Sequence, residues 1–152
     1  MNNLDVKFMK KLSIIFVAIV LVALTACSAK TNKLYDITRE ITAYDSVIIL
    51  PEKENYSLED TVIRYTITNI SDEDAWINSD DACFELHKLV DGKWKLVGTK
   101  CDQVWTDLAQ LLPPKKSVTR EIKLEDYYYL PLEKGVYRIA VENLVSNTFI
   151  VS

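Results

Sequence analysis

Two of the three cysteines, Cys83 and Cys101, have the spacing for covalent chemistry. They flank Asp91-Gly92, and Asp-Gly between two apolar runs is a strong signal for a β-hairpin. A two-residue turn would place Cys83 opposite residue 100, whereas a three-residue loop would place it opposite Cys101. Cross-strand neighbours lie close enough for a disulfide after modest adjustment. The spacing therefore predicts a structural disulfide between Cys83 and Cys101; two free thiols, or a metal or redox site, are the alternatives.

The only histidine is His87. A hydrolytic triad or a zinc site would have to be built around it, yet the sequence contains neither Gly-Xaa-Ser-Xaa-Gly nor His-Glu-Xaa-Xaa-His. Strand alternation places it on the side shared with Glu85 and Leu89, away from Leu86. We therefore expect an exposed or half-buried strand residue, and no catalytic residue is predicted.

Two acidic runs, Asp72-Glu73-Asp74 and Asp80-Asp81, raise the hypothesis of a calcium site, because carboxylates on one loop supply oxygen ligands. The spacing of an EF-hand loop is missing, since no glycine follows at the sixth position and no glutamate closes the frame. A solvated loop is the better interpretation. The sequence predicts no bound metal and no other cofactor.

The aromatic residues Tyr127, Tyr128, Tyr129 and Trp105, with Trp94 nearby, are candidates for ligand binding. Exposed aromatic clusters bind sugars or proteins, because they offer rigid contact area with a polar group attached. In the alternative interpretation, alternation buries one or two of the tyrosines and Trp94 packs in the core.

The first part of the chain has the features of an export signal. Three lysines between residues 7 and 11 precede the almost wholly apolar residues 12–24. This pattern is typical of a secretory signal, since a membrane-spanning helix needs about 20 apolar residues. The stretch Leu24-Thr25-Ala26-Cys27 resembles the bacterial lipobox, which implies cleavage before Cys27 and attachment of a lipid to that cysteine. An uncleaved N-terminal anchor is the alternative.

This interpretation divides the chain into a signal peptide (1–26), a lipidated tether (27–33) and a domain (34–152). Loss of the signal would remove three lysines and one aspartate and change the formal charge from −4 to −6. An acidic domain does not displace the counterions of phosphate, which argues against nucleic acid as a partner. Contact with the membrane would come from the lipid. We expect a protein anchored at the extracytoplasmic face of the cell membrane, where oxidising conditions favour the disulfide.

From residue 34 onward, short β-branched or alternating runs are broken by turn residues, as in a β-sandwich. In residues 60–69 the alternation places Ile63, Tyr65 and Ile67 on the core face. The acidic residues 70–81 read as a loop that Trp76 and Ile77 would attach to the body. Only residues 106–112 look helical. About seven antiparallel strands are expected.

Several motifs resemble, in order and spacing, a bacterial immunoglobulin-like domain family found in exported lipoproteins. The matching residues are Thr66-Ile67-Thr68-Asn69, Leu86 to Trp94, Leu112-Pro113-Pro114, Tyr127-Tyr128 and Gly135-Val136-Tyr137-Arg138-Ile139. The departures are Glu133-Lys134-Gly135 where Pro-Gly is usual, and the pair of Cys83 and Cys101. Tyr137 also resembles the tyrosine corner of such sandwiches, in which the hydroxyl ties a turn to the backbone.

The resemblance implies an all-β, immunoglobulin-like β-sandwich with a role at the cell surface. We expect a non-catalytic module for binding or spacing at the cell envelope, with a protein or a cell-wall component as its partner. The alternative function is binding of a glycan or another small ligand by the tyrosine and tryptophan cluster. Fold alone implies no activity.

Overall fold

A computed structural model describes residues 30–38, 46–79, 84–100, 108–142 and 144–152. Residues Thr31–Ser152 form one compact unit, separate from Met1–Lys30. Six residues of the sequence predictions, namely Cys27, Asp80, Asp81, Cys83, Cys101 and Trp105, lie outside the described residues. Lipidation and the disulfide therefore remain predictions.

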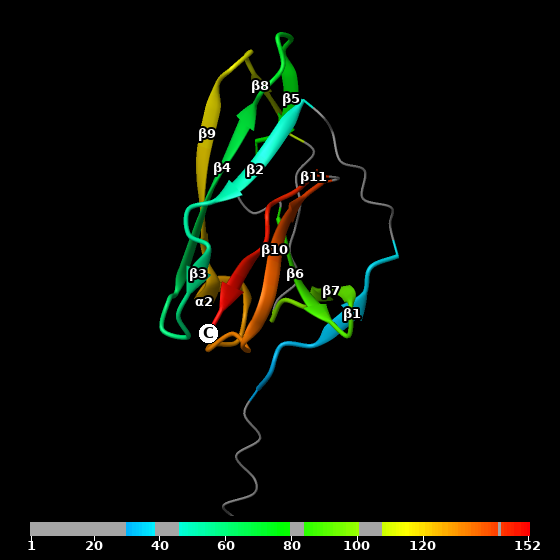
Figure 1. Ribbon diagram of the computed structural model, residues 1–152, viewed down its shortest axis with the longest axis vertical. Coiled ribbons are helices and arrows are strands. Elements are labelled where there is room, and N and C mark those ends of the chain that lie inside the picture. Colours follow the sequence, from blue (N-terminus) through cyan, green and yellow to red (C-terminus); the bar gives the residue numbers. More distant parts are fainter. Residues whose placement is uncertain (1–29, 39–45, 80–83, 101–107, 143) are drawn as a thin grey trace, which may run out of the picture. The chain divides into compact units, whose positions relative to one another are not determined.

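The compact unit consists of short strands and one helical turn (Figure 1). The largest sheet has the order β1 (Leu34–Asp36), β7 (Lys93–Val97), β6 (Glu85–Val90), β10 (Gly135–Val141), β12 (Phe149–Val151) and β3 (Asn55–Tyr56), with β11 (Leu144–Val145) also beside β10. A second sheet has the order β2 (Val47–Pro51), β4 (Val62–Asn69) and β9 (Ser117–Lys123). The strands β5 (Ala75–Asn78) and β8 (Ala109–Leu112) form a separate pair, and the helix α2 spans Leu124–Tyr127. The predicted all-β sandwich is confirmed.

The core lies between the two larger sheets. On β4 the side chains of Ile63, Tyr65 and Ile67 are buried while those between them are more exposed, so the alternation predicted for this strand is confirmed. Leu86 on β6 and Ile139 on β10 belong to the same buried cluster from the opposite sheet. Burial of each large aliphatic side chain contributes about 1.5–3 kcal/mol. The cluster therefore holds the sheets face to face.

The β6–β7 hairpin turns at Asp91-Gly92 in two residues, with Val90 directly opposite Lys93. Both turn residues have positive φ angles, 50° and 75°, as the tight hairpin turn favoured between twisted strands requires. The turn is therefore the two-residue alternative of the sequence analysis, while Cys83 and Cys101 themselves lie outside the described residues. The regular pairing of β7 ends at Val97, before residue 100 is reached. The Lys100 backbone N–H donates to the Tyr127 carbonyl oxygen and not to β6.

Tyr137 on β10 ties down the preceding turn. Its hydroxyl donates to the carbonyl oxygen of Glu133 at 2.7 Å, so the predicted tyrosine corner is confirmed. Lys88 reaches the Glu133 carboxylate at 2.6 Å and lies over the Tyr137 ring. Gly135 has a φ of 155°, and a Cβ there would meet Lys88 Cε at 2.9 Å. The absent side chain leaves room for the lysine.

Two local predictions were wrong. Residues 109–112 of the segment expected to be helical form β8, because they pair antiparallel with β5. The segment 75–78, expected to be loop, is β5 itself. Its residue Ile77 packs into the core, whereas Trp76 is 69% exposed and does not attach the segment to the body.

Candidate functional site

The three consecutive tyrosines do not form one surface cluster. Tyr128 is 1% exposed and packs near Phe84, so it lies in the core, as the alternative interpretation of the tyrosines expected. Tyr127 is half-buried with its ring edge-on to Phe84, at 5.0 Å between ring centroids. The physical reason is that α2 ends at Tyr127 and the chain turns extended, which directs Tyr128 inward. Burial also raises the pKa of the Tyr128 hydroxyl.

The backbone of Tyr129 is hydrogen-bonded to the side chain of Asn32. The Asn32 side-chain amide donates to the Tyr129 carbonyl oxygen at 2.8 Å, and the Tyr129 N–H donates back to Asn32 Oδ1 at 2.8 Å. The Asn32 side chain therefore pairs with the N–H and the carbonyl of Tyr129, as the backbone of a neighbouring strand would. We call this pair of hydrogen bonds the Asn32 clamp.

The segment that follows Asn32 is also held to the domain. The Gly98 N–H donates to the Lys33 carbonyl oxygen at 2.7 Å, and the Tyr35 ring lies directly on Gly98. Asp36 pairs with its cross-strand neighbour Lys95, which lowers the pKa of the Asp36 carboxyl. Residues 31–33, expected in the tether, thus belong to the compact unit.

His87 is 0% exposed, so the expectation of an exposed or half-buried histidine was wrong. Arg138 Nε donates to His87 Nδ1 at 3.2 Å, and His87 Nε2 lies 2.9 Å from Glu85 Oε2. Because Nδ1 accepts, the ring carries its proton on Nε2 and donates it to the carboxylate. Both ring nitrogens are therefore used within the fold, and the ring is sealed from substrate.

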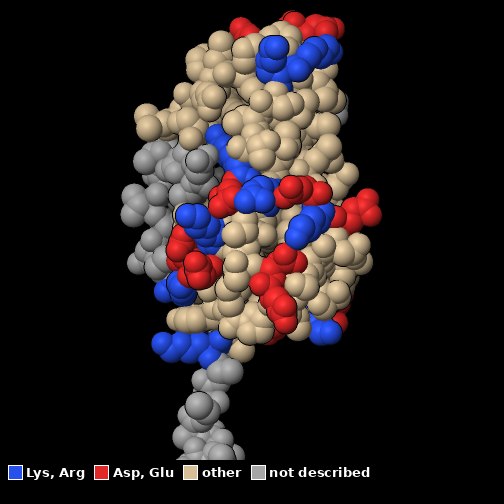
Figure 2. Space-filling view, turned by 90° about the vertical axis from the view of Figure 1, so that its left-hand side faces the viewer, with Lys and Arg blue, Asp and Glu red and all other residues tan. Residues whose placement is uncertain are grey.

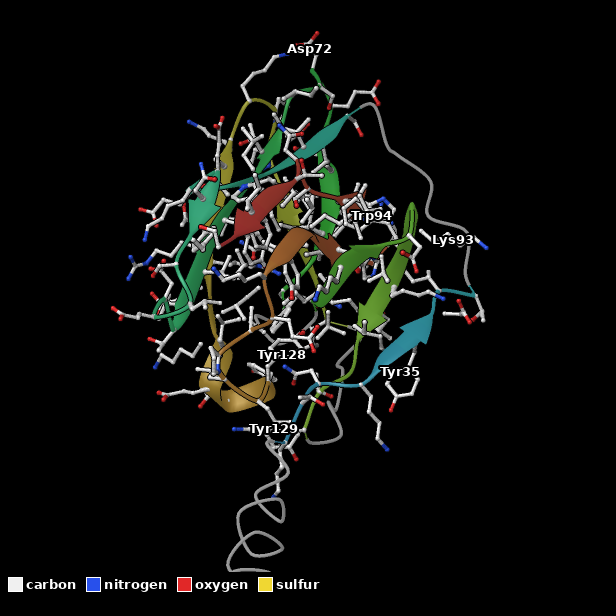
Figure 3. All side chains as sticks on the ribbon, turned by 60° about the horizontal axis from the view of Figure 1, so that its bottom comes forward. Tyr35, Asp72, Lys93, Trp94, Tyr128 and Tyr129 are labelled. Atoms are coloured by element: carbon white, nitrogen blue, oxygen red, sulfur yellow. The ribbon has the colours of Figure 1, made fainter. Side chains whose placement is uncertain are left out.

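Trp94 does not pack between the sheets. Trp94 lies on the β6–β7 hairpin (Figure 3). The Arg138 guanidinium covers its ring, 4.4 Å from the ring centroid. Burial lowers the pKa of Arg138. This stack closes over the strand that carries His87, since Arg138 is the direct cross-strand partner of His87.

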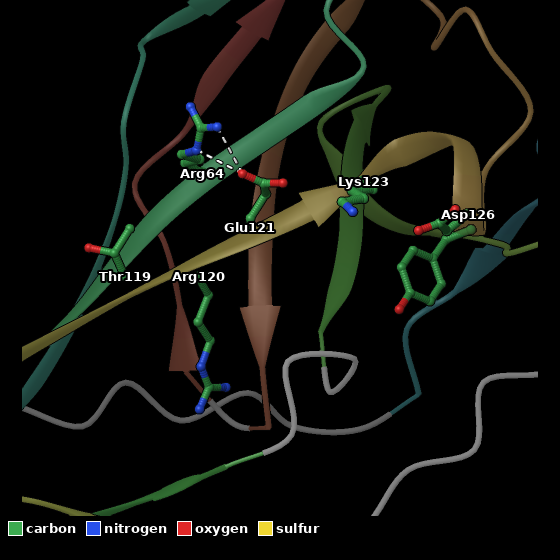
Figure 4. A pocket seen from close by; sticks show the side chains of 7 residues that line it. Arg64, Thr119, Arg120, Glu121, Lys123 and Asp126 are labelled. Atoms are coloured by element: carbon green, nitrogen blue, oxygen red, sulfur yellow. Dashed lines mark hydrogen bonds and ion pairs between the residues drawn. The ribbon is translucent and has the colours of Figure 1, made fainter.

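One polar pocket of about 540 Å³ lies along β9 and α2 (Figure 4). Two of its charges are paired with each other: Arg64 contacts Glu121 at 2.8 Å, and these two residues are direct cross-strand partners. Arg120, on the other face of β9, is buried and donates to the Asn78 carbonyl oxygen. The pairing leaves this pocket little net charge with which to attract a ligand.

The outer face of the β2–β4–β9 sheet continues this pattern. Thr66 bonds Thr119 at 3.1 Å and Thr68 bonds Ser117 at 2.9 Å, each across the strand pair. Figure 2 shows basic and acidic side chains interspersed on this side of the domain. The face therefore reads as a solvated sheet surface stabilised by its own cross-strand pairs.

A hollow of about 620 Å³ lies beside β5 and combines an exposed aromatic ring with carboxylates. We call it the acidic–aromatic hollow. Its wall includes Trp76, Asp72, Glu73, Asp74 and Glu142, all of them exposed. Beside Trp76, its direct cross-strand partner Leu111 is 40% exposed on the same face of the β5–β8 pair. An indole and a leucine exposed together form an apolar patch bordered by negative charge.

Asn69, the last residue of β4, holds the acidic loop of this hollow in place. It is 0% exposed, and its amide donates to the Glu73 carbonyl oxygen at 2.7 Å and to the Leu112 carbonyl oxygen at 2.9 Å. Its Oδ1 accepts from the N–H and the hydroxyl of Ser71. All the donors of one buried amide are therefore used to fix residues 70–74 against β8.

Two further residues shape the hollow. Lys115, in a turn with a φ of 59°, donates to the Ile70 carbonyl oxygen and contacts Asp72 at 2.9 Å. Glu142 has a φ of 54°, a left-handed conformation that non-glycine residues adopt rarely. The hollow thus has one paired carboxylate and three for which the described contacts show no ion pair.

Sequence reasoning missed this hollow because it assigned Trp76 a packing role. The run Ala75-Trp76-Ile77 does alternate, and the alternation with Ile77 inward would have placed Trp76 outward.

Among the described residues, no group of three or more His, Cys, Asp or Glu side chains could hold a metal ion. Within the same residues, no helix has the length and apolarity needed to cross a membrane.

Comparisons with known proteins give a family and a few distant structural likenesses. A β-glucosidase from Erythrobacter marinus shares 16% identity over 69% of this chain at a TM-score of 0.39, and a mutant β-glucosidase from Listeria innocua in complex with laminaribiose shares 17% over 70% at 0.38. An alkylpurine DNA glycosylase from Pseudomonas fluorescens shares 15% over 70% at 0.37. The chain spans 15%, 16% and 30% of the lengths of these three proteins.

No curated protein matches the chain. A family profile described as "Bacterial Ig-like domain" matches residues 45–149, which is more than half of the sequence. The match includes β2 to β10 and therefore both sheets of the sandwich as well as the acidic–aromatic hollow. The chain belongs to the bacterial Ig-like domain family.

Proposed function

We propose that this protein is a lipid-anchored, non-catalytic binding module at the extracytoplasmic face of the cell membrane. In this proposal the lipid on Cys27 holds one end of the domain at the membrane, and the acidic–aromatic hollow is presented at the other end. The observation that supports it most directly is the Asn32 clamp, because it fixes where the tether joins the domain.

The tether is too short to let the domain move far. Asn32 comes five positions after Cys27 in the sequence. A fully extended chain spans about 3.3–3.6 Å per residue, so Asn32 can lie at most about 18 Å from the lipidated cysteine. If Cys27 carries the lipid, the clamp would hold Tyr129, and with it the α2 end of the domain, close to the bilayer.

The hollow lies at the opposite end of the domain. Figure 1 shows β5 and β8 at one end and α2 at the other, and Figure 3 shows Asp72 and Tyr129 at opposite ends. The strand β4 runs between these ends from Val62 to Asn69. At about 3.3 Å per residue it spans roughly 26 Å. The hollow would therefore face away from the membrane.

The absence of catalysis belongs to the proposal. It is supported by the sealed position of His87, whose two nitrogens serve Glu85 and Arg138. The alternative of glycan binding by the tyrosine cluster receives less support, because Tyr128 is in the core and Tyr129 is engaged with Asn32.

The first test is the intact mass of the protein purified from its native membrane. We expect a chain that begins at Cys27 and carries a diacylglyceryl group, and a Cys27→Ala variant that lacks it. Alkylation before and after reduction gives the state of Cys83 and Cys101 in the same measurement. A mass that retains residues 1–26 without lipid would refute the lipid anchor and favour the uncleaved N-terminal anchor.

The second test concerns orientation. A fluorophore is attached at Lys33→Cys or at Asp72→Cys, with the native thiols blocked, in vesicles that contain a nitroxide headgroup lipid. We expect strong quenching at position 33 and little at position 72. Equal quenching at both positions would contradict the proposed orientation.

A further inference from the structure

We propose that the acidic–aromatic hollow binds a cationic, arginine-containing segment of a partner protein, with a guanidinium group stacked on Trp76. This inference deepens the proposed function by naming the chemistry of the partner. It rests on that function only for the location of the partner, at the extracytoplasmic face of the membrane. The binding itself depends on the hollow alone.

Trp76, in the wall of the hollow, and Leu111 beside it form an exposed apolar surface. Trp76 is 69% exposed and Leu111, directly across the β5–β8 pair, is 40% exposed. Tryptophan is enriched among the residues that contribute most to protein interfaces. The indole has only two side-chain torsions, so little conformational freedom is lost when it binds a partner.

The charge of the hollow selects the partner. Asp72, Glu73, Asp74 and Glu142 border the exposed indole, and Lys115 offsets only the first of them. Carboxylates attract a cation, while the ring face attracts it through the quadrupole of the aromatic system. The two attractions act on the same group when that group is a guanidinium or an ammonium.

The molecule already contains the same kind of contact. Arg138 lies over the Trp94 ring at 4.4 Å from its centroid on the β6–β7 hairpin. Arginine is favoured over lysine for such stacking because its planar group covers the ring and still donates to carboxylates. Trp76, with an exposed ring and carboxylates beside it, offers the same arrangement without a cation of its own stacked on it among the contacts described.

Other occupants fit less well. A second copy of this acidic chain would bring like charge to the hollow, and an anionic lipid surface would be repelled in the same way. A neutral glycan could stack on the ring and donate hydroxyl hydrogen bonds to the carboxylates, but it carries no positive charge to balance them. Only a cationic partner both covers the ring and balances the negative charge of the hollow.

The test uses the full-length chain in non-ionic detergent and a fluorescein-labelled peptide of alternating Arg and Gly. Its lysine counterpart and its citrulline counterpart, a neutral isostere of the arginine form, are measured beside it by fluorescence anisotropy. We expect binding in the order Arg, Lys, citrulline, and weakening at high salt because exposed charges are screened.

Variants locate the site. Trp76→Ala should weaken binding of the arginine peptide about tenfold or more, whereas Ile150→Ala, an exposed apolar residue elsewhere, should leave it unchanged. The charge variant carries Asp72→Asn, Asp74→Asn and Glu142→Gln, and its control carries Glu54→Gln, Glu59→Gln and Glu125→Gln. Both change the net charge equally, and only the first should abolish the preference for arginine over citrulline. Circular dichroism checks that each variant is folded.

Three results would overturn the inference: no binding of the arginine peptide at low salt, equal binding of the citrulline peptide, or equal loss in both charge variants. Saturable binding of a neutral oligosaccharide, or self-association that Trp76→Ala removes, without peptide binding would do so too. Failure of anchoring is separable. An unlipidated chain that binds the peptide refutes the anchoring alone, and a lipidated chain that does not bind refutes the inference alone.

Discussion

The Asn69 side-chain amide lies 2.9 Å from the carbonyl oxygen of Leu112, and this contact joins the end of β4 to β8. The same amide bonds the Glu73 carbonyl oxygen, so one buried side chain positions both the acidic loop and the strand behind Trp76. Asn69 is thereby the residue on which the shape of the hollow depends.

Replacement of Asn69 by alanine should destabilise the domain by about 2–4 kcal/mol, since buried carbonyl groups would lose their donors. Hydrogen exchange at Ser71 and Glu73 should accelerate as the loop loosens. Thr68→Ala removes an exposed hydroxyl pair on the same strand and should cost less than about 1 kcal/mol. Equal effects of the two changes, measured by urea unfolding, would contradict the role assigned to Asn69.

Asp60 should make stability depend on acid pH. Lys53 and the Ser57 N–H both donate to its carboxylate and lower the pKa of Asp60 in the folded state. The stabilisation is therefore present above the unfolded value of about 3.9 and is lost as pH falls through the folded pKa.

The melting temperatures of the parent chain and Asp60→Asn measure this effect. Their difference should be constant between pH 5 and 7 and shrink below about pH 4. Lys53→Met should move the onset of the loss to higher pH, because one of the groups that lower the Asp60 pKa is gone. A difference that does not change with pH would refute the assignment.

The buried His87 should be important for stability rather than for activity. Its replacement by alanine leaves the Glu85 carboxylate and the Arg138 guanidinium without their shared partner, at a cost of about 2–4 kcal/mol. A double-mutant cycle with Arg138→Leu should show that the two changes are not additive. Additive changes in unfolding free energy would mean that the residues do not act together.

Gly98→Ala should detach the first strand of the domain. The added Cβ would lie 2.4 Å from Tyr35 Cε2, so the ring and β1 must shift. Overpacking of this kind costs about 1–3 kcal/mol. Cleavage near residues 33–36 by a protease reports the detachment, and Tyr35→Ala in the same chain should reverse part of the loss of stability. If the double variant is no more stable than Gly98→Ala, the clash is not the cause.

The elements with strict alternation were the ones that the sequence could predict. In β4 the period of two separates Ile63 from Thr66 without ambiguity, and Asp91-Gly92 specifies its turn by backbone conformation alone. Tyr137 could be predicted because its bond to Glu133 is local, four residues back along the chain.

The features that the sequence failed to predict depend on partners elsewhere in the chain. Residues 109–112 alternate poorly, and β8 exists because β5, more than thirty residues earlier, pairs with it. His87 is buried because Arg138 and Glu85 close around it, which no local pattern at His87 reveals. Tyr128 turns inward because α2 ends directly before it. The hollow was missed for the same reason, since Trp76 is placed by pairing rather than by its own hydrophobicity.

The short strand β1 also protects the protein from its own copies. An unpaired sheet edge is a template for another chain, and β1 occupies the edge that β7 would otherwise present. On a membrane, proteins anchored by lipids are confined to two dimensions and meet one another often. The segment next to the proposed anchor therefore leaves only a three-residue edge strand with which a neighbouring domain could pair.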